Sequence, residues 1–196
     1  MLFGFFNVNV VAKDNEQSRQ RLLMDFNWKF QPGDQHNAEQ ISFNDSGWRV
    51  LNLPHDWSIE GEYNEDEPTG ESGGYLPTGI SWYRKHFQMT RDELAKNIWI
   101  EFDGVYMNSD VWLNGHHLGS YPYGYSSFYY ALSPYLVEGE NIIAVRVDNS
   151  KQPNTRWYSG SGIYRHDWLV KTDPLHITHW GVYVTTPFVS TDSAAV

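Results

Sequence analysis

The sequence contains no cysteine in its 196 residues. This absence excludes disulfides and thiolate-ligated metal sites, and it leaves both reducing and oxidising compartments open. Basic residues are also scarce, because 14 Lys and Arg stand against 24 Asp and Glu and give a formal net charge of -10. A surface with this charge repels a phosphate backbone, and no basic run reverses the balance locally. The composition therefore argues against nucleic acid as a partner.

The N-terminal stretch MLFGFFNVNVVA is apolar but covers only residues 1–12. A membrane span needs about 20 apolar residues, so the stretch predicts no membrane partner. Two interpretations of residues 1–20 stay open. They are either a disordered or edge-strand tail, or the remnant of a secretory signal peptide with Val10-Val11-Ala12 as its cleavage site.

Aromatic residues are abundant, with 9 Trp, 13 Tyr and 10 Phe making up 16% of the chain. Their flat apolar faces and hydrogen-bonding edges suit the binding of sugars. The same residue types are also favoured in strands and fill the cores of β proteins. The composition alone supports both interpretations.

Alternation of apolar and polar residues recurs along the chain and predicts an all-β fold. In DFNWKFQ, Phe26, Trp28 and Phe30 are expected to share one face of a strand. The other predicted strands are NIWIEFD (97–103), ISWYRKHF (80–87), SDVWLNGHHLGSY (109–121), SSFYYAL (126–132), NIIAVRVDN (141–149), GIYRHDWLV (162–170) and ITHWGVYV (177–184). Asn114-Gly115 predicts a type I′ hairpin turn, in which both central residues need positive φ.

Only TRDELAKN (90–97) indicates a helix, about two turns long, with Thr90 and Glu93 spaced as a capping box. The many strands between turn signals predict a jelly-roll β-sandwich of two antiparallel sheets over residues 21–172. Residues 60–79 form a long acidic, glycine-rich connection. Residues 173–196 are expected to be a linker toward a further part of the protein that the sequence does not include.

The stretch TRWYSGSGIYRHDW (155–168) could be a phosphate-binding loop, a sugar-stacking surface or a strand that enters the core. It lacks the Lys-Ser/Thr of a phosphate loop and the third glycine of a dinucleotide loop. Gly160 and Gly162 instead predict a tight turn that feeds a strand beginning at Ile163. The residues before the turn are then expected on a loop at one end of the sandwich. There the Arg156 guanidinium could donate hydrogen bonds to paired sugar hydroxyls, and the Trp157 ring could stack on the sugar. The alternative is that a nearby carboxylate binds the guanidinium.

Other reactive groups give no catalytic pattern. The acids of residues 60–67 are predicted to be solvated, with calcium binding as the alternative, and no spacing selects the carboxylate pair of a glycosidase. His116 and His117 are neighbours on a strand and so point to opposite faces, which argues against a metal site. Ser161 lies between two glycines but lacks the glycines two residues before and after it that a Gly-x-Ser-x-Gly nucleophile elbow needs. We predict no catalytic and no metal-ligating residue in this chain.

Several motifs together resemble the N-terminal sugar-binding domain of glycoside hydrolase family 2, the family of β-galactosidases, β-glucuronidases and β-mannosidases. The resemblance covers about residues 21–172 in the family's order. It is carried by WKFQPGD (28–34), WRVLNLPHDW (48–57), GGYLPTGISWYRK (73–85), FDGVYMNSDVWLNGHHLG (102–119) and RWYSGSGIYR (156–165). The last motif is most similar to secreted or periplasmic bacterial β-galactosidases, which implies a periplasmic or secreted location with the cytoplasm still open.

The resemblance implies a jelly roll followed by an immunoglobulin-like domain and a TIM barrel as partners in the same polypeptide. The barrel would carry two glutamates about 5 Å apart, which act with retention of configuration, and it could hold a divalent cation. Neither glutamate lies in this chain, and no cofactor is expected in it. The implied function is the non-catalytic sugar-binding domain of an exo-acting β-galactosidase, whose ligand is a terminal β-galactoside or related glycan.

The resemblance also singles out two loops that reach the sugar. One places an aspartate six residues before the glycine at Gly162, where this sequence has Arg156, with Asn154 and Trp157 beside it. The other loop contains Leu76 and Thr78. Leu76 stands where some relatives have a polar residue, so the hydrogen bond that this residue would make to the sugar is absent. The PHDW segment is interpreted as structure, with Asp56 capping backbone donors.

Three alternatives stay open. The chain could be a free-standing carbohydrate-binding module with an aromatic platform on one sheet face. It could be the same domain of a β-glucuronidase or β-mannosidase. It could also be a purely structural sandwich.

Overall fold

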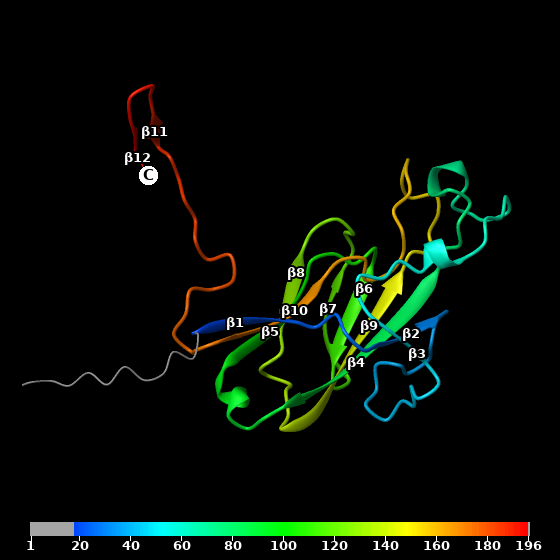
Figure 1. The fold of residues 1–196 in the computed structure, drawn as a ribbon, viewed down its shortest axis with the longest axis horizontal. Helices are drawn as coiled ribbons and strands as arrows, with labels where there is room; N and C mark the ends of the chain where they lie inside the picture. The colour runs from blue at the N-terminus through cyan, green and yellow to red at the C-terminus, as the bar shows by residue number, and fades with distance from the viewer. Residues whose placement is uncertain (1–17, 196) are drawn as a thin grey trace, which may run out of the picture.

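The structure is a computed structural model in which residues 18–195 are described. Two antiparallel sheets pack face to face and form a β-sandwich (Figure 1). The larger sheet has the order β3 (Arg49–Leu51), β2 (Trp28–Pro32), β4 (Ile80–Met89), β9 (Gly139–Asp148), β6 (Ser109–Leu113) and β7 (His116–Tyr121). The smaller has the order β1 (Arg19–Leu23), β10 (Asp167–Thr172), β5 (Asn97–Phe102) and β8 (Phe128–Ala131). The predicted all-β jelly-roll class is confirmed.

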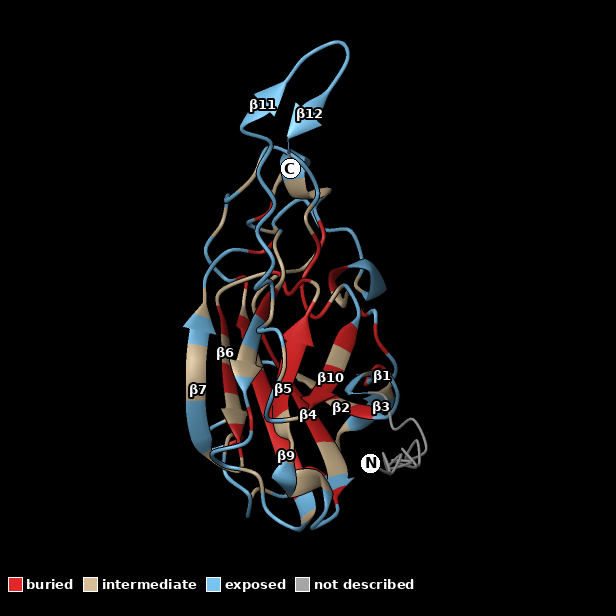
Figure 2. Cartoon of the chain, turned by 90° about the vertical axis from the view of Figure 1, so that its left-hand side faces the viewer, coloured by how far each residue is buried: buried red, intermediate tan, exposed pale blue. Residues whose placement is uncertain are grey.

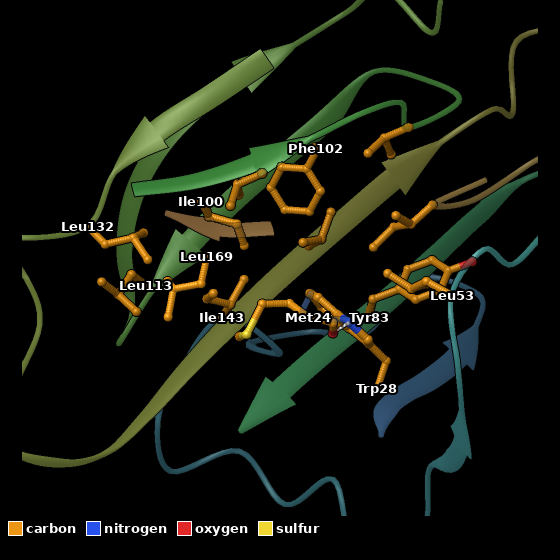
Figure 3. Close-up of a cluster of buried hydrophobic side chains, with 14 of the residues drawn as sticks. Met24, Trp28, Leu53, Tyr83, Ile100, Phe102, Leu113, Leu132, Ile143 and Leu169 are labelled. Atoms are coloured by element: carbon orange, nitrogen blue, oxygen red, sulfur yellow. Dashed lines mark hydrogen bonds between the residues drawn. The ribbon is translucent and has the colours of Figure 1, made fainter. Parts of the chain in front are cut away.

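The core lies between the sheets, where every second residue of a strand points inward. Ile98, Ile100 and Phe102 of β5 are buried as the alternation predicted, and Tyr83 of β4 faces them from the larger sheet (Figure 3). Trp28 is fully buried, and its indole Nε1 donates to the Met24 carbonyl at 2.9 Å. The core thus combines aliphatic packing with aromatic rings whose polar edges are satisfied.

The Asn114-Gly115 turn joins β6 to β7 as predicted, with φ of 51° and 81° at the two residues. Phe26 departs from its prediction, because it is exposed while Trp28 and Phe30 are buried. The reason lies in Asn27, whose φ of 59° interrupts the extended backbone, so β2 begins only at Trp28. Alternation across such a break no longer predicts the face.

The predicted helix over 90–97 is wrong, although its capping contacts form. The Thr90 amide donates to the Glu93 carboxylate at 2.7 Å, and the Glu93 amide donates to the Thr90 hydroxyl at 3.4 Å. Only the 3₁₀ turn η3 (Glu93–Ala95) follows, because β5 begins at Asn97 and leaves no room for a second turn. Of two further 3₁₀ turns, η1 (Ser58–Glu60) leads into the acidic connection and η2 (Glu71–Gly73) lies within it.

Two strand predictions near the C-terminus also need correction. Strand β10 begins at Asp167 and not at Ile163, because Gly162 makes only an isolated bridge with Tyr106 before the chain joins the smaller sheet. Residues 177–184 are not a strand. Part of this segment lies against the smaller sheet, where Arg19 Nη2 donates to the Ile177 carbonyl at 2.5 Å. The chain then runs outward to the exposed hairpin of β11 (Phe188–Val189) and β12 (Ala194–Ala195) (Figure 2).

The boundary predicted after residue 20 falls inside β1, because this strand begins at Arg19 and pairs with Thr172. The possible signal-peptide cleavage site at residues 10–12 lies outside the described residues. No helix of residues 18–195 has the length and apolar character needed to cross a bilayer.

Gly162 sits where the loop before β10 passes over the sandwich. Its φ is 124°, and an added Cβ would lie 2.2 Å from the Tyr83 hydroxyl and 2.8 Å from the His55 carbonyl oxygen. Only glycine combines this backbone conformation with so close an approach.

We therefore expect Gly162→Ala to lower the free energy of unfolding by about 3 kcal/mol or more, from backbone strain and overpacking together. Chemical denaturation measures this loss. Gly47→Ala is the control, since its added Cβ has no atom within 4 Å. A Gly162→Ala variant as stable as the control would contradict the assigned close approach.

Candidate functional site: the loops at one end of the sandwich

Two loops far apart in sequence meet at one end of the sandwich (Figure 1). The first runs through residues 52–79 and leads into β4, and the second runs from the end of β9 through residues 149–166 to β10. Their backbones are hydrogen-bonded, from the His55 amide to the Ile163 carbonyl at 2.8 Å and from the Trp57 amide to the Ser161 carbonyl at 3.1 Å. The two loops therefore form one structural unit.

The carboxylate of Asp56 joins these loops through three hydrogen bonds. Its Oδ1 accepts from the Ser58 amide at 3.1 Å and from the Ser161 amide at 2.8 Å, which confirms its predicted capping role. Its Oδ2 accepts from the Tyr158 hydroxyl at 2.5 Å. Burial and this hydrogen bond raise the pKa of Tyr158, so its phenol stays protonated and continues to donate.

His55 supports the same junction from beneath. Its Nδ1 lies 2.8 Å from the Tyr83 hydroxyl, and its Nε2 lies 2.9 Å from a guanidinium nitrogen of Arg49 and 3.2 Å from a carboxylate oxygen of Glu60. Burial lowers the pKa of His55, which favours the neutral ring. With both ring nitrogens engaged inside the domain, His55 is a structural residue.

Arg156 lies at the tip of the second loop and is exposed. Within residues 18–195 no hydrogen bond or ion pair involves its guanidinium, so the alternative of a carboxylate-bound arginine is not what the structure shows. A free guanidinium at a loop tip can donate several hydrogen bonds to a ligand. Its assignment to sugar binding stays a prediction.

Trp157 is the neighbouring aromatic residue, and its side chain is 60% exposed. Its indole Nε1 donates to the Tyr125 hydroxyl at 2.9 Å. Tyr125 in turn contacts the rings of Tyr106 and Tyr123 edge to face. Trp157 is thus held at its edge while much of the ring stays open, as stacking on a sugar requires.

Asn154 and Thr78 make contacts within the protein. The Asn154 amide donates to Asn149 Oδ1 at 2.6 Å. The Thr78 hydroxyl donates to the Asn149 carbonyl and accepts from Gln152 Nε2 at 3.3 Å. Thr78 therefore has little hydrogen-bonding capacity left for a sugar, while Asn154 is exposed beside the tip.

Asn149 is a buried residue at the centre of the junction that sequence reasoning missed. Its amide nitrogen donates to the Gly160 carbonyl at 3.0 Å and to the Ser161 hydroxyl at 2.9 Å. Its backbone amide donates to the Gly79 carbonyl at 2.9 Å. No sequence signal marks this role, because the alternation predicts Asn149 as the last residue of the strand over 141–149, whereas β9 ends at Asp148.

The cavity between the two loops has a volume of only about 10 Å³. This is about the space of a single water molecule and far too small for a sugar ring. A sugar therefore cannot enter between the two loops, whereas their exposed tips are accessible to one. Leu76 lines this cavity and is buried, so its side chain belongs to the packing between the loops.

The acidic connection shows no ligand geometry for a metal. Residues 18–195 contain no group of three or more His, Asp or Glu side chains arranged to hold an ion. Glu60 pairs with Arg49 at 2.7 Å, and Glu62, Glu65 and Asp66 are exposed.

The sequence matches the family model described as "Glycosyl hydrolases family 2, sugar binding domain" over residues 51–173, which include both loops. The chain belongs to this family. The β-galactosidase BoGH2A of Bacteroides ovatus is 53% identical to it over 91% of this chain and 21% of that protein. A protein of Formosa agariphila named as a putative β-glucuronidase is 44% identical over 90% of this chain and 17% of that protein.

Solved structures of the family show the same fold. A β-glycosidase from Bacteroides vulgatus superimposes with a TM-score of 0.79 at 52% identity, over 81% of this chain and 21% of that one. A family 2 member from Bacteroides cellulosilyticus gives a TM-score of 0.82 at 45% identity, over 89% and 23% of the two chains. The chain thus spans about a fifth of the length of these relatives.

Removal of the Asp56 carboxylate should destabilise the junction of the two loops. Asp56→Ala leaves two backbone amides without their acceptor, and we expect it to reduce the free energy of unfolding by about 2 to 3 kcal/mol. Asp56→Asn keeps one acceptor oxygen and should fall between the variant and the parent. Thermal and chemical denaturation measure both.

Asp66→Ala is the control, because Asp66 is exposed in the same loop system and should change stability by less than about 0.5 kcal/mol. Equal stabilities of Asp56→Ala and Asp66→Ala would contradict the role of Asp56.

Proposed function

We propose that this domain binds the terminal sugar of a β-galactoside as the non-catalytic N-terminal part of a retaining family 2 glycosidase. In this proposal the loop tip with Arg156 and Trp157 completes a pocket whose remaining wall comes from a TIM barrel in the same polypeptide. The immunoglobulin-like domain and the barrel are its proposed partners. The proposed location is periplasmic or secreted.

The observation that carries the proposal is the state of the loop tip. The junction below it is fixed by Asp56 and Asn149, while Arg156 and most of the Trp157 ring face outward. A rigid base limits the entropy lost when the tip meets a ligand. Donors and an aromatic face without partners in residues 18–195 are the features that sugar recognition requires.

The galactoside assignment is supported by the 53% identity to a β-galactosidase. A second candidate is the same role in a β-glucuronidase, which the name of the Formosa relative and the chemistry of Arg156 both favour. An unpaired guanidinium is a natural bidentate partner for the carboxylate of a uronic acid. Substrate assays on the full-length enzyme separate the two.

The direct test is Arg156→Ala in the full-length enzyme that carries this domain. We expect KM for the preferred glycoside to rise about tenfold or more, because one hydrogen-bonding charged group is lost from the pocket, with kcat changed far less. Chromogenic β-galactosides and β-glucuronides are assayed in parallel. The lone domain should hydrolyse neither.

Arg91→Ala is the matched control, since Arg91 is also exposed but lies at the opposite end of the sandwich beside η3. Unchanged kinetics in both arginine variants would overturn the role of the tip. Turnover by the lone domain, abolished by replacing one of its own Asp or Glu residues, would overturn the non-catalytic assignment.

A further inference from the structure

The outer face of the larger sheet carries a second hollow, on the side of β4, β9 and β6 that faces away from the core. It has a volume of about 700 Å³ and is open to solvent. Ligand sites typically have volumes of about 300 to 1,000 Å³. None of its lining residues belongs to the loops 52–79 and 149–166 described above.

Two tryptophans from different strands lie together in this hollow. Trp82 of β4 and Trp112 of β6 stack with their ring centroids 5.3 Å apart and their planes 23° from parallel. Ala144 of β9 is fully buried and packs with them. Because β9 lies between β4 and β6, its small side chain leaves room for the two rings to meet above it. Trp82 is almost fully buried, whereas Trp112 stays partly exposed.

A β-bulge changes the pairing of β6 with β7 beside the two tryptophans. The register of β6 and β7 shifts between Val111 and Trp112, so that Trp112 lies opposite His117. The two rings are in contact, with centroids 5.1 Å apart. Bulges of this kind commonly re-aim a side chain near a binding site. Here the shift places a half-exposed imidazole beside the partly exposed indole.

The polar groups around the rings are held in place by one another. Asp34 accepts from Arg146 Nε at 3.0 Å, from Arg146 Nη2 at 2.9 Å and from Trp82 Nε1 at 2.9 Å. The hydrogen bonds from Arg146 lower the pKa of Asp34 to about 2, so it is ionised throughout the physiological range. Asp110 accepts from His117 Nε2 at 3.2 Å and from the Ser120 hydroxyl.

The balance of charge points to the kind of ligand. The hollow holds three carboxylates, those of Asp34, Glu39 and Asp110, against the single guanidinium of Arg146. An anionic ligand would meet net repulsion there. Carboxylates with free lone pairs accept hydrogen bonds from hydroxyl groups, and an exposed aromatic surface packs against the C–H groups of a sugar ring.

We propose that this sheet face is a second carbohydrate site, which binds an internal stretch of a neutral glycan chain. Trp112 supplies the apolar contact, and Asp34, Asp110 and His117 supply the hydrogen bonds. The open shape suits a chain that continues beyond the site on either side. This site is independent of the proposed role of Arg156 and Trp157, and it would hold the domain on a polysaccharide whose terminal residue is bound elsewhere.

Affinity electrophoresis of the chain tests the proposal. The gels contain β-1,4-galactan, galactomannan or hydroxyethylcellulose as neutral polysaccharides, and polygalacturonate as the anionic one. We expect retardation by at least one neutral polymer and none by polygalacturonate. Trp112→Ala should weaken the retained interaction by about tenfold, which corresponds to the loss of one aromatic contact.

His117→Ala provides a second variant with little risk to the fold, because its side chain is 47% exposed, and it should weaken retention by about threefold or more. Trp180→Ala is the control, since Trp180 is exposed on the side of the smaller sheet and should leave retention unchanged. Melting curves verify that each variant is folded.

Three results would overturn the proposal: no retardation by any neutral polymer, stronger retardation by polygalacturonate, or equal retardation of Trp112→Ala and the parent. Trp157→Ala separates the two sites. If it alone abolishes retention, the glycan binds at the loop tip and the sheet-face site is wrong. If only Trp112→Ala abolishes retention, the sheet face binds the glycan, and the kinetics of Arg156→Ala still decide the role of the tip.

Discussion

The bond between the Asp56 carboxylate and the Ser161 amide is the contact on which the loop end depends. It joins two residues separated by 105 positions in the sequence and closes the first loop over the second. The Tyr158 hydroxyl and the Ser58 amide converge on the same carboxylate. Without this acceptor, buried donors would lose their partners, and the tip with Arg156 would lose its fixed base.

The sandwich beneath allows this arrangement because most of its core comes from the strands, to which the two loops add Leu53 and Ile163. The central strands bury apolar side chains between the two sheets, so the rest of each loop is free to carry polar and aromatic groups outward. Gly160 and Gly162 permit the second loop to approach Asp56 and Tyr83 more closely than any side chain would allow. The residues that stabilise the domain thus differ from those that we propose for recognition.

The two candidate surfaces differ in their chemistry. The loop tip presents an unpaired cation beside an open indole, whereas the sheet face presents paired rings among fixed carboxylates. The first is suited to complete a pocket with another domain, and the second to contact an extended chain. In the two proposals together, the domain contacts a glycan at two places.

Much of this architecture could be predicted from the sequence, because strand alternation and the Asn114-Gly115 turn are local signals. The prediction that Phe26 shares the buried face of Trp28 and Phe30 was wrong, because the positive φ of Asn27 interrupts the strand. The predicted helix at Thr90 was wrong where a following strand limits its length. Arg156 and Trp157 were predicted to lie on a loop by the glycine pattern and the family resemblance, and the structure places both at an exposed tip.

The contacts that fix the site could not be predicted in the same way. Asn149, Tyr125 and Tyr158 are bound by partners 11, 32 and 102 positions away, and nothing in their immediate neighbours marks these pairings. The Asp34–Arg146 pair of the sheet face spans 112 positions. Such pairings depend on how the strands assemble and not on local propensity.

Amide hydrogen exchange at residue resolution tests the central claim most directly. If Asp56 fixes the loop end, the Ser161 amide exchanges as slowly as the core amides of Ile143 and Val145 in the parent, and becomes fast when Asp56 is replaced by alanine. Rapid exchange of the Ser161 amide in the parent protein would contradict the account, because the tip would then have no fixed base.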